Sequence, residues 1–444
     1  MHKTGIQRLP AIDVSSPSDP SDRLSVIARR LLKLMVLVLV VGGSALQAAP
    51  IEISGPIDED TTLLQGATYH VTGALTVEED VTLTILHGTV LKSESTVWIR
   101  VDGTLQVNGT EADPVYFTEV RDSSVGLEVE SGDPQPGSWR YVHVRDGGVA
   151  DLNHLHVRYA SNFSYPRSIW ASGGGLLTLR DSVISQGRRV GIEISGGSED
   201  HIIERTLVET HETQGIVLSG TSGAIQLTDN IVRDNGSHGL QLINVTGLVT
   251  LRNNQITNGG GHGIVISGSG LPESPNGSSP LIDIVGNRIS TQSLDGLRII
   301  DSQVSIESNR IFDNQGTGIS LEGETTTPDL FGNWISSNAG GGIDASDEAN
   351  PVVGGTRDTG NDIAGNSAFG IRNQTAEGVV IQAQCNWWGH ESGPFEPNEN
   401  PQGQGDAIEG PGGVEFDNFL DESAIDGVFR DRFQMTDDNG QNGC

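Results

Sequence analysis

Hydrophobic and polar residues alternate in many short stretches of the chain. Val81-Thr82-Leu83-Thr84-Ile85 and Val304-Ser305-Ile306 are clear examples. A period of two is typical of β-strands, in which successive side chains point to opposite faces. The connecting segments are short and rich in glycine and small polar residues, which favours turns over helices. The pattern therefore predicts a chain of short strands and tight turns.

A longer repeat organises these strands from residue 181 onward. A small polar residue, often Asn, stands two positions before an Ile, and a Gly followed by Ile or Leu comes later in the same unit. These glycines occur at positions 191, 215, 239, 263, 296, 318, 342 and 370. A period of about 24 residues is too short for most helical repeats and suits coils that stack about 4.8 Å apart. The sequence thus predicts an all-β solenoid.

The polar residue before each Ile is predicted to form a ladder along the coil axis. Stacked asparagines can hydrogen-bond to one another and to turn backbone that would otherwise be buried without a partner. We assign this row a structural role, with a solvent-facing binding row as the alternative. The row reads Ser182, Arg205, Asp229, Asn254, Asn287, Asn309, Asn333 and Asn361.

Motifs at both ends of this region resemble a known family. The stretch from Val71 to Phe117, with Asp102-Gly-Thr-Leu, and the later Cys385-Asn-Trp-Trp-Gly389 are similar to the first and last coils of bacterial secreted right-handed β-helix proteins of the pectin-lyase-like group. The resemblance implies a single-stranded right-handed parallel β-helix over residues 71–394. Open ends need caps, which we expect at 49–70 and 395–425. Because the group includes lyases, hydrolases, epimerases and adhesins, the resemblance does not define the function.

The N-terminal segment has the pattern of a signal peptide, which indicates export from a bacterial cell. Arg29, Arg30 and Lys33 precede an apolar run and then small residues up to Ala48, as in a signal peptide, so residues 1–48 are interpreted as a leader. We expect a secreted, periplasmic or cell-surface monomer with no transmembrane helix in the mature chain. Residues 426–444 form an acidic, polar tail.

The charge of the chain limits its partners. There are 58 acidic residues against 26 Lys and Arg, and Lys92 is the single lysine after the leader. A chain without a basic stripe is not expected to bind nucleic acid. Neutral sugars or metal cations fit this composition better, although acidity alone also serves solubility.

One row of the repeat carries candidate chemistry. The residues just before three successive repeat glycines are His238, His262 and Asp295, and Gln241 and Arg298 belong to the neighbouring row. Gly261-His262-Gly263 and Arg298-Ile299 resemble motifs of polygalacturonase-type hydrolases, so His262, Asp295 and Arg298 are the catalytic candidates. His238 and Gln241 are candidate binding residues.

The carboxylate pairs of that hydrolase family are absent. Glu212-Thr213-Gln214 and Ser237-His238 stand where the resemblance would place the acid and the base. We therefore expect no catalysis by that route. His238, His262 and Asp295 could instead hold a divalent cation, because two imidazoles and a carboxylate are a common ligand set. The alternative is that these are turn residues without a ligand.

Aromatic residues gather between positions 159 and 170. Tyr159, Phe163, Tyr165 and Trp170 could stack against sugar rings, or they could pack onto the coil as a local cluster. The two cysteines, Cys385 and Cys444, could form a disulfide in an oxidising compartment.

The sequence leaves three functions open. The preferred hypothesis is a secreted β-helix that interacts with a polysaccharide or a cell-surface glycan without catalysis. A polysaccharide lyase or glycoside hydrolase that uses His262, Asp295 and Arg298 is the first alternative. A structural surface or adhesion protein is the second.

Overall fold

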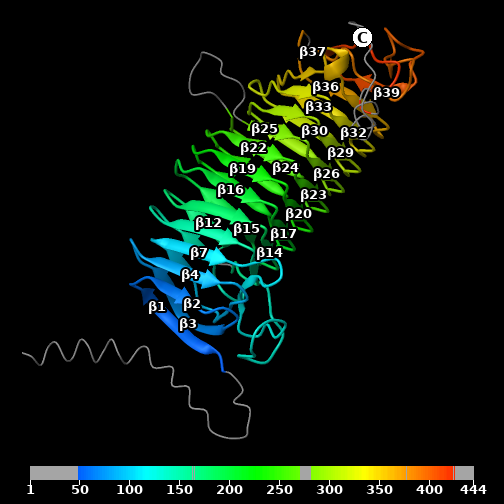
Figure 1. The fold of residues 1–444 in the computed structure, drawn as a ribbon. Coiled ribbons are helices and arrows are strands. Elements are labelled where there is room, and N and C mark those ends of the chain that lie inside the picture. Colours follow the sequence, from blue (N-terminus) through cyan, green and yellow to red (C-terminus); the bar gives the residue numbers. More distant parts are fainter. Residues whose placement is uncertain are drawn as a thin grey trace, which may run out of the picture. The chain divides into compact units, whose positions relative to one another are not determined.

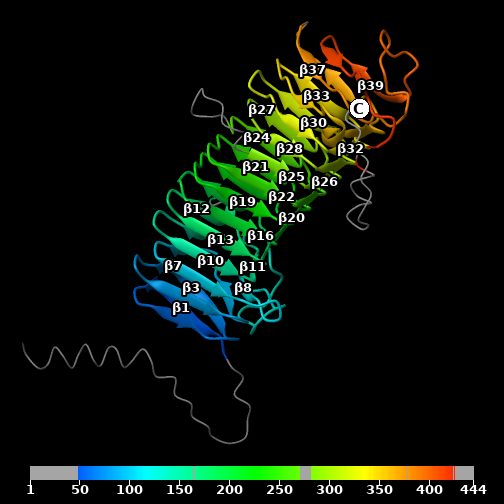
Figure 2. The same cartoon turned by 45° about the horizontal axis from the view of Figure 1, so that its top comes forward.

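The protein is a parallel β-solenoid, shown in two views in Figures 1 and 2. The computed structural model describes residues 49–162, 164, 166–270, 282–376, 378–423 and 425. Every strand pair between the named strands is parallel, and each strand pairs with its equivalent in the next coil. The predicted fold class, a right-handed parallel β-helix with coils of about 24 residues, is confirmed.

The strands fall into three series, which we call A, B and C in the order in which a coil passes through them. In a 26-stranded sheet, series A and B are joined through two long strands, β1 (Ile51–Ile57) and β3 (Thr68–Val77), which run through both series. Series A consists of β5 (Val90–Ser93), β8 (Val115–Glu119), β11 (Leu155–Arg158), β14 (Val183–Ser185), β17 (Leu207–Glu209), β20 (Ile231–Arg233), β23 (Gln255–Thr257), β26 (Arg288–Ser290), β29 (Arg310–Phe312), β32 (Trp334–Ser336) and β35 (Asp362–Ala364).

Series B follows series A in each coil. It consists of β6 (Ile99–Val101), β9 (Val142–Val144), β12 (Arg167–Ser172), β15 (Val190–Ser195), β18 (Ile216–Ser219), β21 (Leu240–Ile243), β24 (Ile264–Ser267), β27 (Leu297–Ile300), β30 (Thr317–Glu322), β33 (Gly341–Ser346), β36 (Ile371–Asn373) and β39 (Gly405–Glu409). The short strand β38 (Pro394–Phe395) pairs with β39.

Series C is a separate 14-stranded sheet. It consists of β2 (Thr61–Leu63), β4 (Thr82–Leu86), β7 (Thr104–Asn108), β10 (Val149–Asn153), β13 (Leu176–Arg180), β16 (His201–Glu204), β19 (Ile225–Thr228), β22 (Val249–Arg252), β25 (Ile282–Val285), β28 (Ser305–Glu307), β31 (Asp329–Phe331), β34 (Val352–Val353), β37 (Val380–Gln382) and β40 (Gly413–Glu415). A short 3-10 helix, η1 (Arg357–Thr359), lies between β34 and β35.

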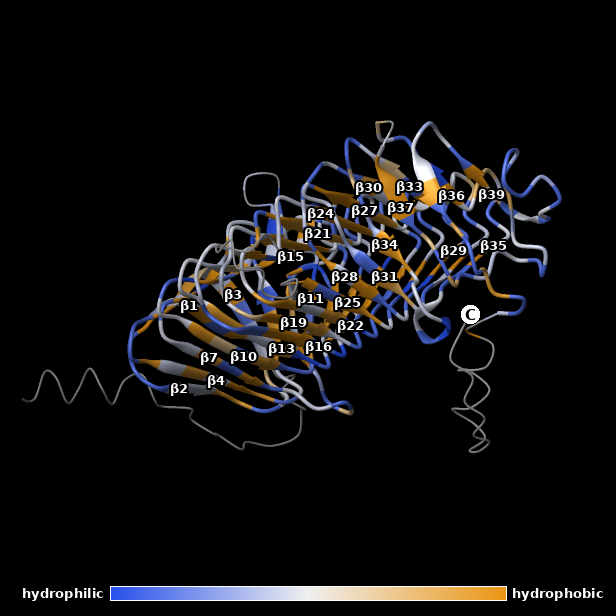
Figure 3. Cartoon of the chain, turned by 90° about the horizontal axis from the view of Figure 1, so that it is seen from above, coloured by the Kyte–Doolittle hydropathy of each residue, from blue (hydrophilic) through white to orange (hydrophobic). Residues whose placement is uncertain are grey.

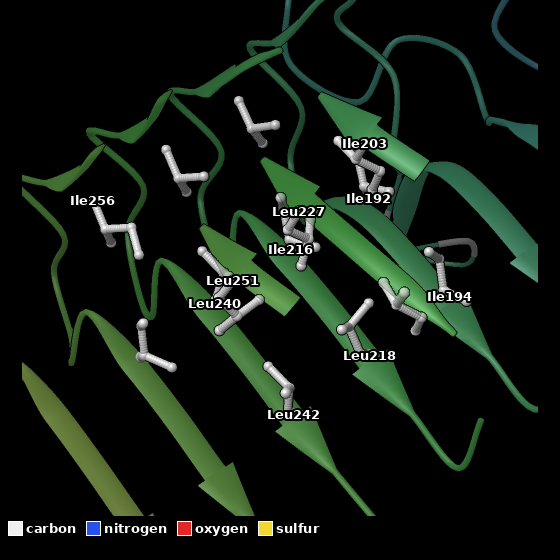
Figure 4. Close-up of a cluster of buried hydrophobic side chains, with 14 of the residues drawn as sticks. Ile192, Ile194, Ile203, Ile216, Leu218, Leu227, Leu240, Leu242, Leu251 and Ile256 are labelled. Carbon is white, nitrogen blue, oxygen red and sulfur yellow. The ribbon is translucent and has the colours of Figure 1, made fainter. Parts of the chain in front are cut away.

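The core is a column of aliphatic side chains inside the coils. Ile192 and Ile194 of β15 and Ile203 of β16 are fully buried, and the next coils repeat the arrangement (Figure 4). Figure 3 shows hydrophobic strands separated by hydrophilic turns. The period of two in the sequence thus places one set of side chains inside and leaves the other set on the outer faces.

A ladder of buried polar side chains lines the two-residue turn between series C and series A. From Thr206 onward, each backbone N–H donates to the side-chain oxygen of the next ladder residue over 2.8 to 3.0 Å. The predicted asparagine ladder is therefore confirmed from Asn254 onward. The ladder residues are Ser182, Thr206, Asn230, Asn254, Asn287, Asn309, Asn333, Asn361 and Asn386.

For two coils the predicted ladder residue was wrong by one position, since the ladder residues are Thr206 and Asn230. Arg205 and Asp229 are not ladder residues, because the buried residues of their coils are Val208 and Val232 and not the neighbouring Leu207 and Ile231. Arg205 and Asp229 instead begin the turn, at φ of 48° and 56°, and border a surface groove.

Coil-type pairing continues into both segments that were predicted to be caps. At the N-terminal side, β1 pairs with β3 and β2 pairs with β4. At the C-terminal side, β36 pairs with β39 and β37 pairs with β40. The predicted leader (1–48) and tail from 426 to 444 lie outside the described residues. In the described part of the chain, no helix has the length and hydrophobicity to cross a membrane.

Candidate functional site

The three residues of the predicted histidine row are neighbours on successive coils. The rings of His238 and His262 stack with their centroids 5.2 Å apart. Nδ1 of His238 accepts a hydrogen bond from the backbone N–H of His262 over 3.1 Å. Nδ1 of His262 lies 3.1 Å from the backbone nitrogen of Asp295 and 3.2 Å from its Oδ2, and Asp295 Oδ1 accepts from the backbone of Thr317.

This row behaves as another backbone ladder. Nδ1 of each ring is occupied by the next coil, and burial lowers the pKa of His238, with smaller contributions from His262 and Arg298. In the parts of the chain that the structure describes, no group of three His, Cys, Asp or Glu side chains is arranged to hold a metal ion. The geometry supports the turn-residue alternative better than the divalent-cation hypothesis.

The other candidates of this region have partners of their own. Arg298 was expected beside Asp295, but its guanidinium donates to Glu322 over 2.8 Å. Gln241 accepts from the amide of Gln214 over 2.9 Å. The structure thus brings His238, His262 and Asp295 together and turns Arg298 toward another coil.

The aromatic segment is partly described. Trp170 is a strand residue of β12, and its ring stacks on His143 at 3.8 Å between centroids with 7° between the planes. The guanidinium of Arg167 lies 4.4 Å from the Trp170 ring centroid. The indole Nε1 of Trp170 donates a hydrogen bond to the hydroxyl of Ser195. These contacts place Trp170 in a local cluster and favour the packing alternative for this residue.

Tyr159 is half-buried, and this burial, with a smaller contribution from the charge of Asp122, raises the pKa of its hydroxyl. Phe163 and Tyr165 lie outside the described residues. Cys385 is buried. Its predicted partner Cys444 also lies outside the described residues, so the disulfide stays a prediction.

A groove that the sequence did not reveal lies on the outer side of series A. It has a volume of about 450 Å³. Its floor is formed by Val183, Leu207 and Ile231, which are in register on β14, β17 and β20. Ile231 is 37% exposed, so the floor presents an aliphatic side chain to solvent.

Charged turn residues form one rim of this groove. Arg205 donates two hydrogen bonds to Asp181, over 2.7 and 2.9 Å, and a third to Glu204. The Arg205 hydrogen bonds hold the pKa of Asp181 below its usual range. His154 and Asp229 continue the rim on neighbouring coils. The groove therefore joins an apolar floor to a row of hydrogen-bonding groups.

The floor belongs to a longer outer row of series A. Nine residues on successive strands occupy it, which at about 4.8 Å per coil spans about 38 Å. In chain order they are Tyr116, His156, Val183, Leu207, Ile231, Gln255, Arg288, Arg310 and Trp334. In Figure 1 the labels from β14 to β32 follow this series along one side of the solenoid.

Other parts of the chain close the row at both ends. The excursion of residues 120–138, between β8 and β9, packs back on series A, where the Leu127 backbone donates to Thr68 and Arg158 donates to Ser124. It covers Lys92, whose buried ammonium donates to the carbonyl of Asp122 over 2.7 Å. At the other end, Ser423 hydrogen-bonds to Asp362 of β35.

The fold and this groove define a class of protein: a parallel β-helix with a surface groove over one strand series. The chain belongs to the right-handed beta helix family. The model described as "Right handed beta helix region" matches residues 142–274 and 276–368, which is just over half of the chain. A second model, "Pectate-lyase like beta helix domain", matches residues 55–129.

Several solved structures are similar to the chain at low sequence identity. The periplasmic alginate epimerase AlgG is 14% identical, with a TM-score of 0.46 and coverage of 80% of this chain and 78% of that chain. The A-module of the mannuronan C-5 epimerase AlgE6 from Azotobacter vinelandii is 14% identical, with a TM-score of 0.40 and coverage of 81% and 89%. The catalytic unit of an alpha-1,3-glucanase from Streptomyces thermodiastaticus is 13% identical, with a TM-score of 0.40 and coverage of 81% and 64%.

The descriptions of these neighbours name two epimerases and a glucanase. At these values the likeness concerns the fold alone. A search of curated proteins finds no match.

Proposed function

We propose that this protein is an exported, non-catalytic binding protein that holds a polysaccharide along the outer row of series A. The observation that carries the proposal is the groove over Val183, Leu207 and Ile231, which lies within the outer row of nine strands. A row of about 38 Å suits an extended polymer better than a small ligand.

The chemistry of the groove suits sugars. The C–H faces of sugar rings pack on apolar floors, and their hydroxyl groups need hydrogen-bonding partners at the side. The aliphatic floor supplies the apolar surface for the sugar ring. The rim supplies the hydrogen-bonding partners for the hydroxyl groups, and its residues are His154, Asp181, Arg205 and Asp229. Because the row continues from coil to coil at a constant spacing, it can contact several successive sugar units of one chain.

Three carboxylates line the groove, those of Glu111, Asp181 and Asp229, and the central one does not have the properties of a glycosidase acid. Hydrolysis of a glycosidic bond needs a proton donor with a raised pKa opposite a second carboxylate. Asp181 shows the opposite behaviour, since Arg205 lowers its pKa and occupies its oxygens. The carboxyl group of Asp406 does have a pKa raised by burial, but its oxygens accept from Gly365 and Asn366 in the last coils. These observations support binding without cleavage.

A binding screen with one floor variant tests this function. The purified protein is measured against a panel of neutral and uronate polysaccharides, with reducing ends and unsaturated products followed in the same samples. We expect at least one polymer to bind without turnover. Ile231→Asp places a charge on the floor and should weaken that binding about tenfold or more, because a buried sugar face would have to desolvate the carboxylate.

The chain offers a matched control for this variant. Val352 is a strand residue of series C with 38% exposure, almost the same as Ile231, and lies outside the groove lining. Val352→Asp should keep wild-type affinity, and both variants should keep the unfolding midpoint. The proposal is wrong if no polymer binds, if Ile231→Asp binds like the wild type, or if products appear and are lost in His262→Ala. The last result would favour the enzyme hypothesis, and the first would favour the structural or adhesion role.

A further inference from the structure

An arginine–aromatic cluster occupies the C-terminal part of the same outer face. We call it the platform and define it as Arg288, Arg310, Phe312 and Trp334 of β26, β29 and β32. The rings of Phe312 and Trp334 lie 5.4 Å apart between centroids. The guanidinium of Arg288 lies 4.2 Å from the Phe312 centroid, and that of Arg310 lies 5.7 Å from the Trp334 centroid.

The charges of the chain are distributed unevenly over its three strand series. The strands of series C carry two arginines and six carboxylates: Arg180, Arg252, Asp151, Glu204, Asp283, Glu307, Asp329 and Glu415. The strands from β5 to β35 of series A show the reverse, with five basic residues and three carboxylates: Lys92, Arg158, Arg233, Arg288, Arg310, Glu119, Glu209 and Asp362. The general acidity of the chain, with 58 acidic residues against 26 basic ones, is thus locally inverted on series A.

Most of these basic groups are already engaged. Lys92 is buried, Arg158 lies 3.5 Å from Asp122, and Arg233 pairs with Glu209 over 2.8 Å. Arg288 differs from them. It is exposed, and among the described residues its side chain makes neither an ion pair nor a hydrogen bond; its contact is the Phe312 ring.

We propose that the platform is an anion-selective subsite, which binds a sugar ring that carries a carboxylate or a sulfate group. A guanidinium binds such groups through two parallel hydrogen bonds while its flat face stays on an aromatic ring. In the subsite the anionic group of the sugar binds the guanidinium of Arg288, and the ring of the sugar lies against the aromatic residues of the platform, Phe312 and Trp334. This inference rests on the proposed function, because it assigns a ligand class to one end of the proposed binding row.

Pairs of polymers that differ by one group test the subsite. Polygalacturonate is compared with its carboxyl-reduced form, and a sulfated galactan is compared with its desulfated form. The same affinity measurement is made on the wild type, Arg288→Gln and Arg252→Gln. Arg252 is the matched control, since it is also an exposed strand arginine without an ion pair among the described residues, but it belongs to series C.

We expect the wild type to bind at least one anionic polymer about tenfold or more tightly than its neutral form. The preference should decrease with added salt and disappear in Arg288→Gln, while Arg252→Gln retains it. The polymer pair that shows the preference identifies the anion as carboxylate or sulfate. Equal binding of both members of each pair, or an unchanged preference in Arg288→Gln, would overturn the subsite and leave the proposed function standing. Absence of binding to every polymer would overturn both.

Discussion

Replacement of Asn309 by alanine is expected to lower the free energy of unfolding by about 3 to 5 kcal/mol. Asn309 is buried in the ladder between series C and series A. Its Oδ1 accepts from the backbone N–H of Asn287 over 2.8 Å and from the Asn287 amide over 3.0 Å. Its own amide donates to the carbonyl of Ile284 and to Asn333 Oδ1. Alanine removes all four hydrogen bonds and leaves the Asn287 N–H without an acceptor in a buried turn.

The size of this effect distinguishes a ladder from a row of ordinary turn residues. Asn350 is an exposed asparagine of the same region, and its side chain makes no hydrogen bond in the described structure. Asn350→Ala should therefore change the unfolding free energy by less than about 0.5 kcal/mol. Guanidinium unfolding of the wild type and both variants measures the difference. Similar midpoints for Asn309→Ala and Asn350→Ala would contradict the structural role of the ladder.

Acidification is expected to destabilise the protein through a buried histidine. His211 lies in a second polar ladder, where its backbone N–H and ring Nδ1 contact Asn235 Oδ1 at 3.0 and 3.2 Å. Burial lowers the pKa of His211 to about 4. The folded state therefore disfavours the charged ring, while the unfolded chain takes up a proton near pH 6.5. The neutral His211 ring therefore causes no loss of stability above pH 6.5, and the free energy of unfolding falls as the pH decreases from 6.5 toward 4.

The expected loss is about 2 kcal/mol between pH 7.5 and pH 5 for this one group. His211→Asn tests its origin, because asparagine occupies the equivalent ladder position at Asn235 in the next coil. The variant should have the wild-type free energy of unfolding at pH 7.5. Between pH 7.5 and pH 5 this free energy should fall by about 2 kcal/mol less than in the wild type, as measured by denaturant unfolding at several pH values. If the pH dependence of His211→Asn equals that of the wild type, the buried neutral ring is not its cause.

Much of the fold is predictable from the sequence because the physical cause is local. Alternating residues such as Val304-Ser305-Ile306 define strands, and the repeated Asn two positions before Ile defines the turn that the ladder occupies. The prediction was wrong at Arg205 and Asp229, where the inward residues are valines. Two adjacent apolar residues after the turn, as in Leu207-Val208 and Ile231-Val232, are compatible with both registers, and packing against the neighbouring coils selects one of them.

The candidate site was less predictable. The row of His238, His262 and Asp295 was found correctly as neighbours, but a sequence does not show that each Nδ1 is occupied by the next coil. The groove was missed because Leu207 and Ile231 are expected inside by their hydrophobicity. One signal was present: each is followed directly by Val, so two adjacent apolar residues compete for one inward position. The basic character of series A was missed because net charge describes the whole chain and not one face.

The most direct test of the central claim is a map of where a bound polysaccharide protects the protein. Amide hydrogen exchange, or a structure of the complex, is measured with the polymer that binds best in the screen. Protection, or ligand density, is predicted over β14, β17 and β20 and over the platform strands β26, β29 and β32. Protection on series B around His238, His262 and Trp170, with series A unchanged, would contradict the account and return the binding site to the row that the sequence first indicated.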